Sequence, residues 1–511
     1  MNKALKVFLV GGVAGAVGWA VSGGSPLVAA VSAAMAGLVM VSGQSKTPTN
    51  FGVVARGTEV STKRRRGFSP ADQIAIGGIP VAPEFEPQHF LGVGAPGTGK
   101  TVVNEAFLDV IRARGQRAII YDSTGEFVSH FYRPDRDIIL SPIDTRSAQW
   151  SPWAEGTSPY ALQNLATAFI PESNPDRFWG EAGRAILQSI LVQTQDMPAF
   201  SDTLFKMELG ELYDAIVASG YGGYIGPPNQ FASARSVACV YCRPLTYLPP
   251  LTEKPFSIRD WVRDEHNDSW LFVSSRADVH ESVRPLISMW LGIAVQACMS
   301  LPPDRNRRLW FCLDELPTLQ KLPSLDLLLA GARKYGAAAI LGVQSIAQIR
   351  DVYGREAAAA ILSHPSTRLT LRVGDSETAE YLSKNLGDRH TIRTVQSESK
   401  SGGGSKSESE QHAIEAAVLP SEILALPNLV GYLRTPNDPI IKKVRLTPRD
   451  RVQIAEPYQD RDLNIPPPIP AAPAGPSVLD KGFLASLTPG NPGPDSPDGP
   501  DGPDGPDLPD L

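Results

Sequence analysis

The sequence predicts an α/β fold in which a mainly parallel sheet carries a phosphate-binding loop, interrupted by a mostly helical insertion. The stretch His89–Thr101 reads HFLGVGAPGTGKT, an apolar run followed by a glycine-rich turn and then by helix-forming residues to about Ala113. Short apolar runs alternate with helical patterns along the chain, which is typical of strand–helix–strand units in a parallel sheet. Finally, the apolar run Leu309–Leu313 ends in two acids, Asp314 and Glu315.

The glycine-rich turn satisfies the P-loop pattern G-x-x-x-x-G-K-[ST]. Its residues are Gly94, Ala95, Pro96, Gly97, Thr98, Gly99, Lys100 and Thr101. Glycines let backbone N–H groups surround phosphates without a Cβ in the way, and the following helix points its positive end at them. We expect Lys100 to reach the β- and γ-phosphates of ATP and the Thr101 hydroxyl to bind Mg²⁺. The alternative, a chance match, is disfavoured by the strand and helix on either side.

Asp314 and Glu315 are predicted to lie beside this loop, because ligands bind at the carboxyl ends of strands in open α/β sheets. Asp314 would hold Mg²⁺ through water, and Glu315 would be the base that orients or deprotonates the attacking water. Gln344 follows another apolar run, Ala337–Val343, where a polar side chain can sense the γ-phosphate. The alternative there is a simple helix cap by Ser345.

The charge of the chain is unevenly distributed. The formal net charge is −6, but residues 466–511 contain seven Asp and one Lys and so account for all of it. A neutral body does not indicate nucleic-acid binding through bulk charge, so any such contact would need a local basic patch. The four Cys fit a reducing cytoplasm. Cys239-x-x-Cys242 is half of a zinc-site pattern without a second half, which favours buried thiols.

Two apolar segments open the chain, and we interpret residues 1–45 as a transmembrane hairpin. No charged residue occurs from Val7 to Ser45, and Ser22–Pro26 interrupts the run. Two spans, roughly 5–21 and 27–43, have basic residues at both outer ends, which predicts that both ends are cytoplasmic. A secretory signal peptide is the alternative, but it leaves the second segment unexplained.

The remaining elements follow from local patterns. Residues 157–264 predict an all-α insertion, with further helices packed on the main sheet as the alternative. Residues 457–511 predict a disordered tail rich in Pro, Asp and Gly, in which Ser477–Leu487 is either a segment that folds on a partner or a passive spacer. Ser397–Glu410 predicts a flexible polar loop. Strands are expected at 118–121, 137–140, 270–273, 309–313, 337–343, 367–373 and 440–446, with small strands within 68–87 and helices at 102–113, 281–301 and 324–334.

Several segments resemble the type IV coupling proteins of conjugation and type IV secretion, the TraD/TraG-like ATPases. They are RGTEV (56–60), YDSTGEF (121–127), SPIDTRSAQWSPWAE (141–155), LDELPTLQKLPSLDLLLAGARKYGAAAILGVQSIAQ (313–348) and AEYLSKNLG (379–387). The resemblance spans about residues 50–450. It implies a hexameric ring that is anchored in the bacterial inner membrane and has a RecA-like motor domain (46–156 and 265–456). In such a ring the motor domain hydrolyses ATP and moves single-stranded DNA, with its attached relaxase, to the secretion channel.

The resemblance also implies roles for single residues. It places the third motif of the motor on Gln344 and suggests Arg333 as an arginine finger that reaches a neighbour's nucleotide, with an interface salt bridge as the alternative. Relaxosome and inner-membrane secretion components are the implied partners. The family's usual periplasmic stretch between the two spans is missing, because only about five residues separate them. A membrane docking receptor with little pumping, and a chromosome-segregation translocase, are the other readings.

Overall fold

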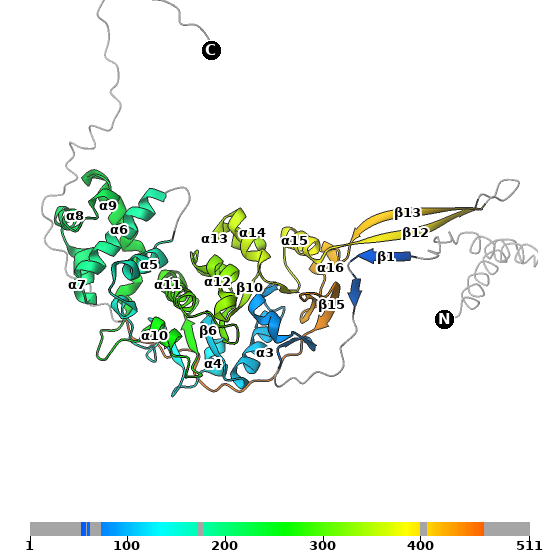
Figure 1. The fold of residues 1–511 in the computed structure, drawn as a ribbon, viewed down its shortest axis with the longest axis horizontal. Helices are drawn as coiled ribbons and strands as arrows, with labels where there is room; N and C mark the ends of the chain where they lie inside the picture. Colours follow the sequence, from blue (N-terminus) through cyan, green and yellow to red (C-terminus); the bar gives the residue numbers. More distant parts are fainter. Residues whose placement is uncertain (1–52, 58, 62–72, 172–176, 399–405, 464–511) are drawn as a thin grey trace, which may run out of the picture. The chain divides into compact units, whose positions relative to one another are not determined.

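The centre of the fold is a ten-stranded sheet in the order β2-β15-β14-β11-β5-β10-β9-β6-β8-β7 (Figure 1). It is seen in a computed structural model that describes residues 53–57, 59–61, 73–171, 177–398 and 406–463. All neighbours from β11 to β7 are parallel, whereas β14 is antiparallel to both β11 and β15. The predicted α/β fold with a mainly parallel sheet is therefore confirmed. The strands are β2 (Glu59–Ser61), β5 (Phe90–Val93), β6 (Arg117–Asp122), β7 (Ile138–Leu140), β8 (Leu271–Ser274), β9 (Leu309–Leu313), β10 (Ala337–Val343), β11 (Thr367–Thr370), β14 (Val430–Arg434) and β15 (Ile440–Arg445).

Helices cover both faces of the sheet, so its central strands are buried on both sides. On one face lie α3 (Lys100–Ala113) and α4 (Glu126–Phe131); on the other lie α11 (His280–Met299), α12 (Leu325–Gly331), α13 (Ile346–Tyr353) and α14 (Arg355–Ser363) (Figure 1). The side chains of strand β9 point alternately to the two faces of the sheet. Trp310 and Cys312 belong to the apolar cluster under α3, and Phe311 belongs to the cluster under α11. A continuous apolar run is what such a doubly covered parallel strand requires.

Every regular element described between residues 157 and 264 is helical. The helices are α5 (Pro159–Phe169), α6 (Arg177–Gln193), α7 (Met197–Ser201), α8 (Leu209–Ala218), α9 (Pro228–Cys242) and α10 (Ile258–Arg263), joined by short 3-10 and π turns. Ser158 and Ser257 cap α5 and α10 by accepting hydrogen bonds from backbone N–H groups. One apolar cluster runs from α5 and α6 through α11 to the sheet. The helical segment therefore shares a core with the sheet, and its status as a separate domain stays a prediction.

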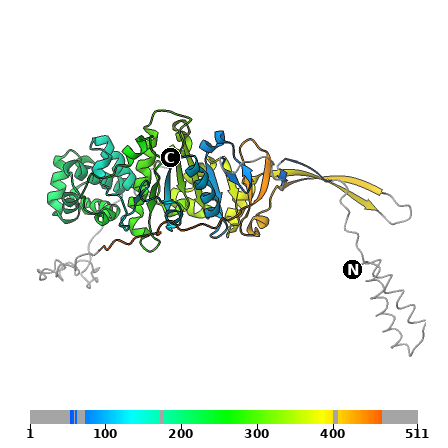
Figure 2. The same ribbon diagram turned by 90° about the horizontal axis from the view of Figure 1, so that it is seen from below.

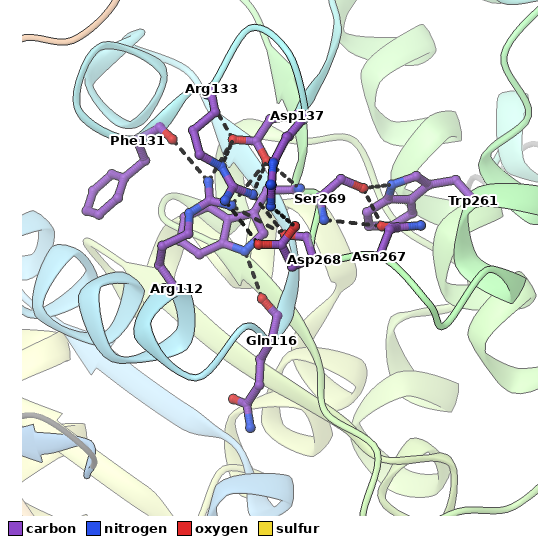
Figure 3. Close-up of polar contacts among 11 residues, drawn as sticks. Arg112, Gln116, Phe131, Arg133, Asp137, Trp261, Asn267, Asp268 and Ser269 are labelled. Atoms are coloured by element: carbon purple, nitrogen blue, oxygen red, sulfur yellow. Dashed lines mark hydrogen bonds and ion pairs between the residues drawn. The ribbon is translucent and has the colours of Figure 1, made fainter.

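A polar network ties the end of the helical segment to the sheet (Figure 3). Arg112 donates hydrogen bonds of 3.1 and 2.8 Å to the two carboxylate oxygens of Asp137, whose side chain is fully buried. The Arg112 guanidinium also lies 3.4 Å from the centre of the Trp270 ring. Arg133 joins Asp137 to Asp268. The network fixes where the chain re-enters the sheet at β8.

Two paired strands occupy both ends of the loop predicted at Ser397–Glu410, whose middle part, residues 399–405, lies outside the described residues. β12 (Asp388–Glu398) pairs antiparallel with β13 (Lys406–Ala416), and β12 also pairs with β1 (Val53–Gly57) (Figure 2). At these two ends the predicted loop was wrong, because the prediction relied on the polarity of the residues. A two-sided polar ribbon can satisfy its backbone groups by cross-strand pairing without a buried face.

After β15 the chain continues as an extended strap, residues 447–461, which crosses α3 and α4. Arg451 pairs with Glu105 and Asp109 on α3, Ile454 N–H donates to the Ser129 carbonyl, and Arg461 N–H donates to the Ile143 carbonyl. Ordered contacts thus pass the predicted tail boundary at residue 457 by a few residues, because polar strap residues find partners on the domain surface.

Two predicted segments lie outside the described residues: the hairpin at 1–45 and the tail from 464 onward. Within the described part of the chain, one helix, α11, is long and apolar enough to cross a membrane by length and composition. Most of α11 is buried inside the fold, as expected for a helix that packs between the sheet and α5.

Candidate nucleotide site

The predicted phosphate-binding loop connects β5 to α3 at the carboxyl end of the sheet. Gly94 N–H donates to the Val343 carbonyl, and the Thr98 hydroxyl donates to the Ala95 carbonyl at 2.7 Å, which holds the turn closed. Gly99 has φ 117°, and a Cβ there would lie 2.9 Å from side-chain atoms of Leu429 and Leu446. Only glycine fits this backbone conformation and this space. The local chemistry therefore produces the loop that the pattern predicts.

Lys100 begins α3 and turns back over the loop. Its Nζ donates a 2.6 Å hydrogen bond to the Gly94 carbonyl and lies 3.7 Å from Glu315 Oε2. Desolvation lowers the pKa of Lys100, although the Glu315 and Asp314 carboxylates oppose the shift. Lys100 is therefore held in a partly dry site, where a positive charge interacts strongly with an anion. Thr101 follows in the first turn of the same helix, partly exposed.

Asp314 follows β9, two strands away from β5 with β10 between them. Its carboxylate accepts a short hydrogen bond from Asn104, one turn beyond Lys100 on α3. Burial raises the pKa of Asp314 to about 6, while the Asn104 hydrogen bond and the Lys100 charge oppose the shift. A Cβ at Gly342 on β10 would collide with the Asp314 carbonyl. Glycine at that position is what lets the β9 end pass so close to its neighbour.

Glu315 is largely buried beside Lys100. Desolvation raises its pKa to about 7, and the charge of Lys100 and the Gln344 side chain oppose that shift. Its Oε1 is buried and has no hydrogen-bond partner within the part of the chain that the structure describes. Gln344 directly follows β10, which separates β5 from β9. The structure therefore brings the predicted residues Lys100, Asp314, Glu315 and Gln344 to one edge of the sheet.

Arg333 lies elsewhere. It is exposed in the 3-10 turn Ala332–Tyr335, which precedes β10 and so sits at the amino end of the strand whose carboxyl end carries Gln344. The seven residues of β10 span roughly 20 Å at about 3.3 Å per residue. Arg333 therefore cannot serve the site of its own chain, which leaves the neighbour's site or a salt bridge as its role.

Two residues of the site were not assigned a role from the sequence. Asn104 orients Asp314, and its position four residues after Lys100, on the same helix face, was the available signal. Asp122 ends β6 in the way that Asp314 ends β9, and it is fully buried. Its oxygens accept hydrogen bonds from the N–H groups of Thr124, Gly125 and Val128. Because backbone donors occupy Asp122, it shapes the turn into α4 and is not available as a metal ligand.

A second acidic group lies along α3 and α4. Glu105, Glu126 and His130 are the one set of three potential metal ligands that the described residues bring together. His130 Nδ1 lies 2.7 Å from Glu105 Oε1, and Arg451 Nε lies 2.9 Å from Glu105 Oε2. Arg451 pairs with the Glu105 carboxylate, so Glu105 serves as a polar anchor of the strap. Cys239 and Cys242 on α9 have pKa values raised by burial, which favours the thiol over the zinc-binding thiolate.

The arrangement suits a nucleoside triphosphate with Mg²⁺. The loop and the first turn of α3 offer backbone N–H groups and a lysine to phosphate oxygens. Glu315 Oε1, buried without a partner among the described residues, offers a free acceptor for the proton of a water molecule. Thr101 and Asp314 offer oxygen ligands, which Mg²⁺ prefers. The donor set therefore fits phosphoryl transfer to water.

Comparison with known families gives a consistent match. The family model described as "Type IV secretion-system coupling protein DNA-binding domain" covers residues 73–447. Coupling protein TraD of Escherichia coli (strain K12) is 34% identical over 410 residues, which are 76% of this chain and 57% of TraD. Conjugal transfer protein TraG of Rhizobium radiobacter is 30% identical over 159 residues, 30% of this chain and 25% of that protein. The chain thus spans little more than half the length of TraD.

Solved structures show the same fold. The unbound bacterial conjugative coupling protein TrwBdeltaN70 matches with a TM-score of 0.70 and 28% identity, covering 81% of this chain and 99% of that one. Plasmid coupling protein TrwB in complex with ADP and Mg²⁺ matches with the same TM-score and identity, covering 81% of this chain and 100% of that one. TrwB in complex with the ATP analogue ADPNP is equally similar.

Proposed function

Because the chain belongs to the family of type IV secretion-system coupling proteins, we propose that it is an inner-membrane ATPase that drives single-stranded DNA into a type IV secretion channel during conjugation. The observation that carries the proposal is the meeting of Lys100, Asp314, Glu315 and Gln344 at one sheet edge. The nucleotide complexes of TrwB support ATP and Mg²⁺ as ligands of this site. The buried Glu315 oxygen, which has no partner among the described residues, supports hydrolysis in addition to nucleotide binding.

Each residue has a distinct task in hydrolysis. The residues Gly94–Thr101 hold the phosphates, and Lys100 leaves the Gly94 carbonyl to bind phosphate oxygens instead. Thr101 and Asp314 would hold Mg²⁺, which supplies positive charge to the phosphates when bound. Glu315 accepts a proton from the attacking water, a task for which a pKa near 7 is well matched. Gln344, beside Glu315, orients that water.

Arg333 acts on the site of a neighbouring subunit. Its exposure and its distance from the Gln344 end of β10 support a role in trans, in a ring that we propose to be a hexamer. A positive charge supplied by a neighbour stabilises the charge that develops on the phosphates and makes hydrolysis depend on assembly. A subunit with Arg333→Ala should then lower the ATP turnover of the neighbouring subunit, while its own affinity for nucleotide stays the same.

The remaining parts of the proposal concern organisation. For residues 1–45, which lie outside the described residues, the proposal is a two-span anchor that leaves the bulk of the chain in the cytoplasm. Residues 46–156 and 265–456 form a RecA-like motor domain, and the helical segment 157–264 faces the relaxosome and its relaxase. Inner-membrane secretion components meet the anchor or the cytoplasmic face. The description of the matching family model as a DNA-binding domain supports DNA as the transported substrate.

The test is DNA transfer between cells by a Glu315→Gln strain. Loss of transfer by about 10²-fold or more is expected for removal of a general base, with protein level and membrane fraction unchanged. Glu380→Gln, an exposed carboxylate on α15 (Ser376–Leu386), is the matched control and should transfer normally. Normal transfer by Glu315→Gln would contradict the motor and favour a docking receptor in which nucleotide mainly stabilises assembly.

A further inference from the structure

A polar groove of about 760 Å³ lies at the end of the sheet opposite to the nucleotide site. The segments before β5 and β11 and the turn between β14 and β15 form its walls, so we call it the amino-end groove. Gln88, Ser363, His364, Arg368, Asn385 and Arg434 are among its lining residues, with the turn 435–439. Gln88 and the P-loop flank β5 at its two ends. One short strand therefore separates this groove from the phosphate-binding loop.

The groove contains two arginines that oppose each other. Arg368 on β11 and Arg434 on β14 are direct partners in the antiparallel ladder. Like charges placed directly opposite destabilise a strand pair. Desolvation lowers the pKa of Arg368, and the Arg434 charge lowers it further. Among the described residues, no acidic side chain forms an ion pair with either arginine, so the repulsion between them is not neutralised.

Neither guanidinium lies within 4.0 Å of a carboxylate in the described part of the chain. Arg368 donates to the Asn385 side chain at 2.8 Å and to the carbonyls of Ser363 and Pro365. Arg434 donates to the Asn385 backbone carbonyl at 2.6 Å. The one carboxylate among the lining residues, Asp438, lies 3.4 Å from Lys442 and accepts from Ile440 N–H. The groove therefore has an unbalanced positive charge.

The walls are stiff and polar. Pro365, Pro436 and Pro439 line the groove, and Asn437 has φ 58° in the tight turn, so the shape is set before a ligand arrives. Serine, threonine, asparagine and glutamine side chains add neutral hydrogen-bond donors. Apart from the three prolines, the lining residues include no aliphatic side chain that could hold an acyl chain, and the His364 ring is the one aromatic group among them. Its charged and hydrogen-bonding groups suit phosphate oxygens better than lipid tails, and phosphate contacts carry no sequence information.

We propose that the amino-end groove binds backbone phosphates of single-stranded DNA, without regard to base sequence. The inference rests on the proposed function, in which DNA is the substrate. Arg434 and Arg368 supply the charge, and the hydroxyl and amide groups position the strand. A local patch of this kind is what a chain with a neutral body needs for nucleic-acid contact.

The test is the salt dependence of binding between the full-length protein in detergent and fluorescent single-stranded oligonucleotides. Each lost phosphate contact reduces the slope of log K against log salt by about 0.7 for single strands. We expect that reduction for Arg434→Gln, equally on oligo(dT) and mixed sequences. Arg434→Lys keeps the charge and should keep the slope. Thr435→Lys adds a charge to the groove and should steepen the slope by about the same 0.7.

The matched control is Arg355→Gln, an exposed arginine on α14 outside the groove, which should leave the slope unchanged. Nucleotide affinity should be the same in every variant, which separates a groove effect from misfolding. If the wild type binds DNA and both Arg434→Gln and Thr435→Lys keep its slope, the groove proposal is wrong while the proposed function stands. If the wild type does not bind single-stranded DNA, both are overturned.

Discussion

The Lys100 ammonium lies 3.7 Å from the Glu315 carboxylate, although Lys100 begins the helix after β5 and Glu315 follows β9, and β10 separates these two strands. Lys100 also donates to the Gly94 carbonyl, so one cation joins the phosphate-binding loop to the predicted base. The two groups are mutually dependent, because each lowers the cost of keeping the other charged in a partly dry site.

Lys100→Ala should remove most of the affinity for ATP. The substitution deletes a positive side chain that contacts the loop, so the phosphates lose a direct ionic partner. In a titration with a fluorescent ATP analogue, we expect the dissociation constant to rise at least about tenfold, which is a loss of about 1.4 kcal/mol of binding free energy. Lys384→Ala, exposed on α15, is the control. Unchanged affinity in Lys100→Ala would show that the loop does not bind the phosphates as described.

His89 should make the fold acid-sensitive. Its Nδ1 accepts from Ala339 N–H at 3.0 Å, and its Nε2 lies 3.1 Å from the Leu329 carbonyl, which requires the neutral ring with a proton on Nε2. Burial lowers its pKa from 6.5 to about 4. Between these values the unfolded chain binds the proton and the folded chain does not, so stability falls as the pH falls from 6.5 toward 4.

The expected contribution of His89 to this loss is up to about 3 kcal/mol. His89→Asn keeps a hydrogen-bonding side chain and tolerates the φ of 64° at this position, but it has no titrating ring. Denaturant unfolding at pH 7 and at pH 5 should show a smaller pH-dependent loss of stability in the variant than in the wild type. An identical loss in both would mean that His89 is not the titrating group.

Asp137→Asn should be strongly destabilising. The fully buried carboxylate accepts hydrogen bonds from Arg112, Arg133 and the Trp270 N–H. Removing its charge leaves two guanidinium groups without their main partner, which costs about 3–5 kcal/mol for a buried pair. Chemical denaturation measures the loss. The neighbouring Asp135→Asn, exposed in the same loop, should change stability by less than about 0.5 kcal/mol.

Arg451→Ala should release the strap from α3. Arg451 is largely buried, contacts Glu105 and Asp109, and lies over the Phe131 ring. Hydrogen exchange at the Ile454 and Ala455 amides, which donate to the Ser129 carbonyl, should accelerate in the variant. Arg449→Ala removes a more exposed contact with Asp109 and should have a smaller effect. Equal exchange in the two variants would show that Arg451 does not hold the strap.

The sequence could predict the sheet and the nucleotide site, because both depend on local patterns. Apolar runs ending in polar residues located β5, β9 and β10, and the parallel arrangement then brought Lys100, Asp314, Glu315 and Gln344 together. The P-loop glycines and the helix that follows are also local features, which is why their positions agree closely with the structure.

Other features depend on contacts between distant residues and could not be read in this way. The hairpin of β12 and β13 consists mostly of polar residues, so no regular apolar pattern indicates its pairing with β1. The strap depends on ion pairs such as Arg451 with Glu105, which lie far apart in the chain. The opposition of Arg368 and Arg434 appears only when the register of β11 and β14 is known.

The central claim is that this chain is an ATP-driven motor that moves DNA, and ATP turnover by the whole chain with and without single-stranded DNA tests it most directly. The account predicts that DNA stimulates turnover and that Glu315→Gln abolishes the stimulation while nucleotide still binds. Assembled protein whose turnover is the same with and without DNA would contradict the account.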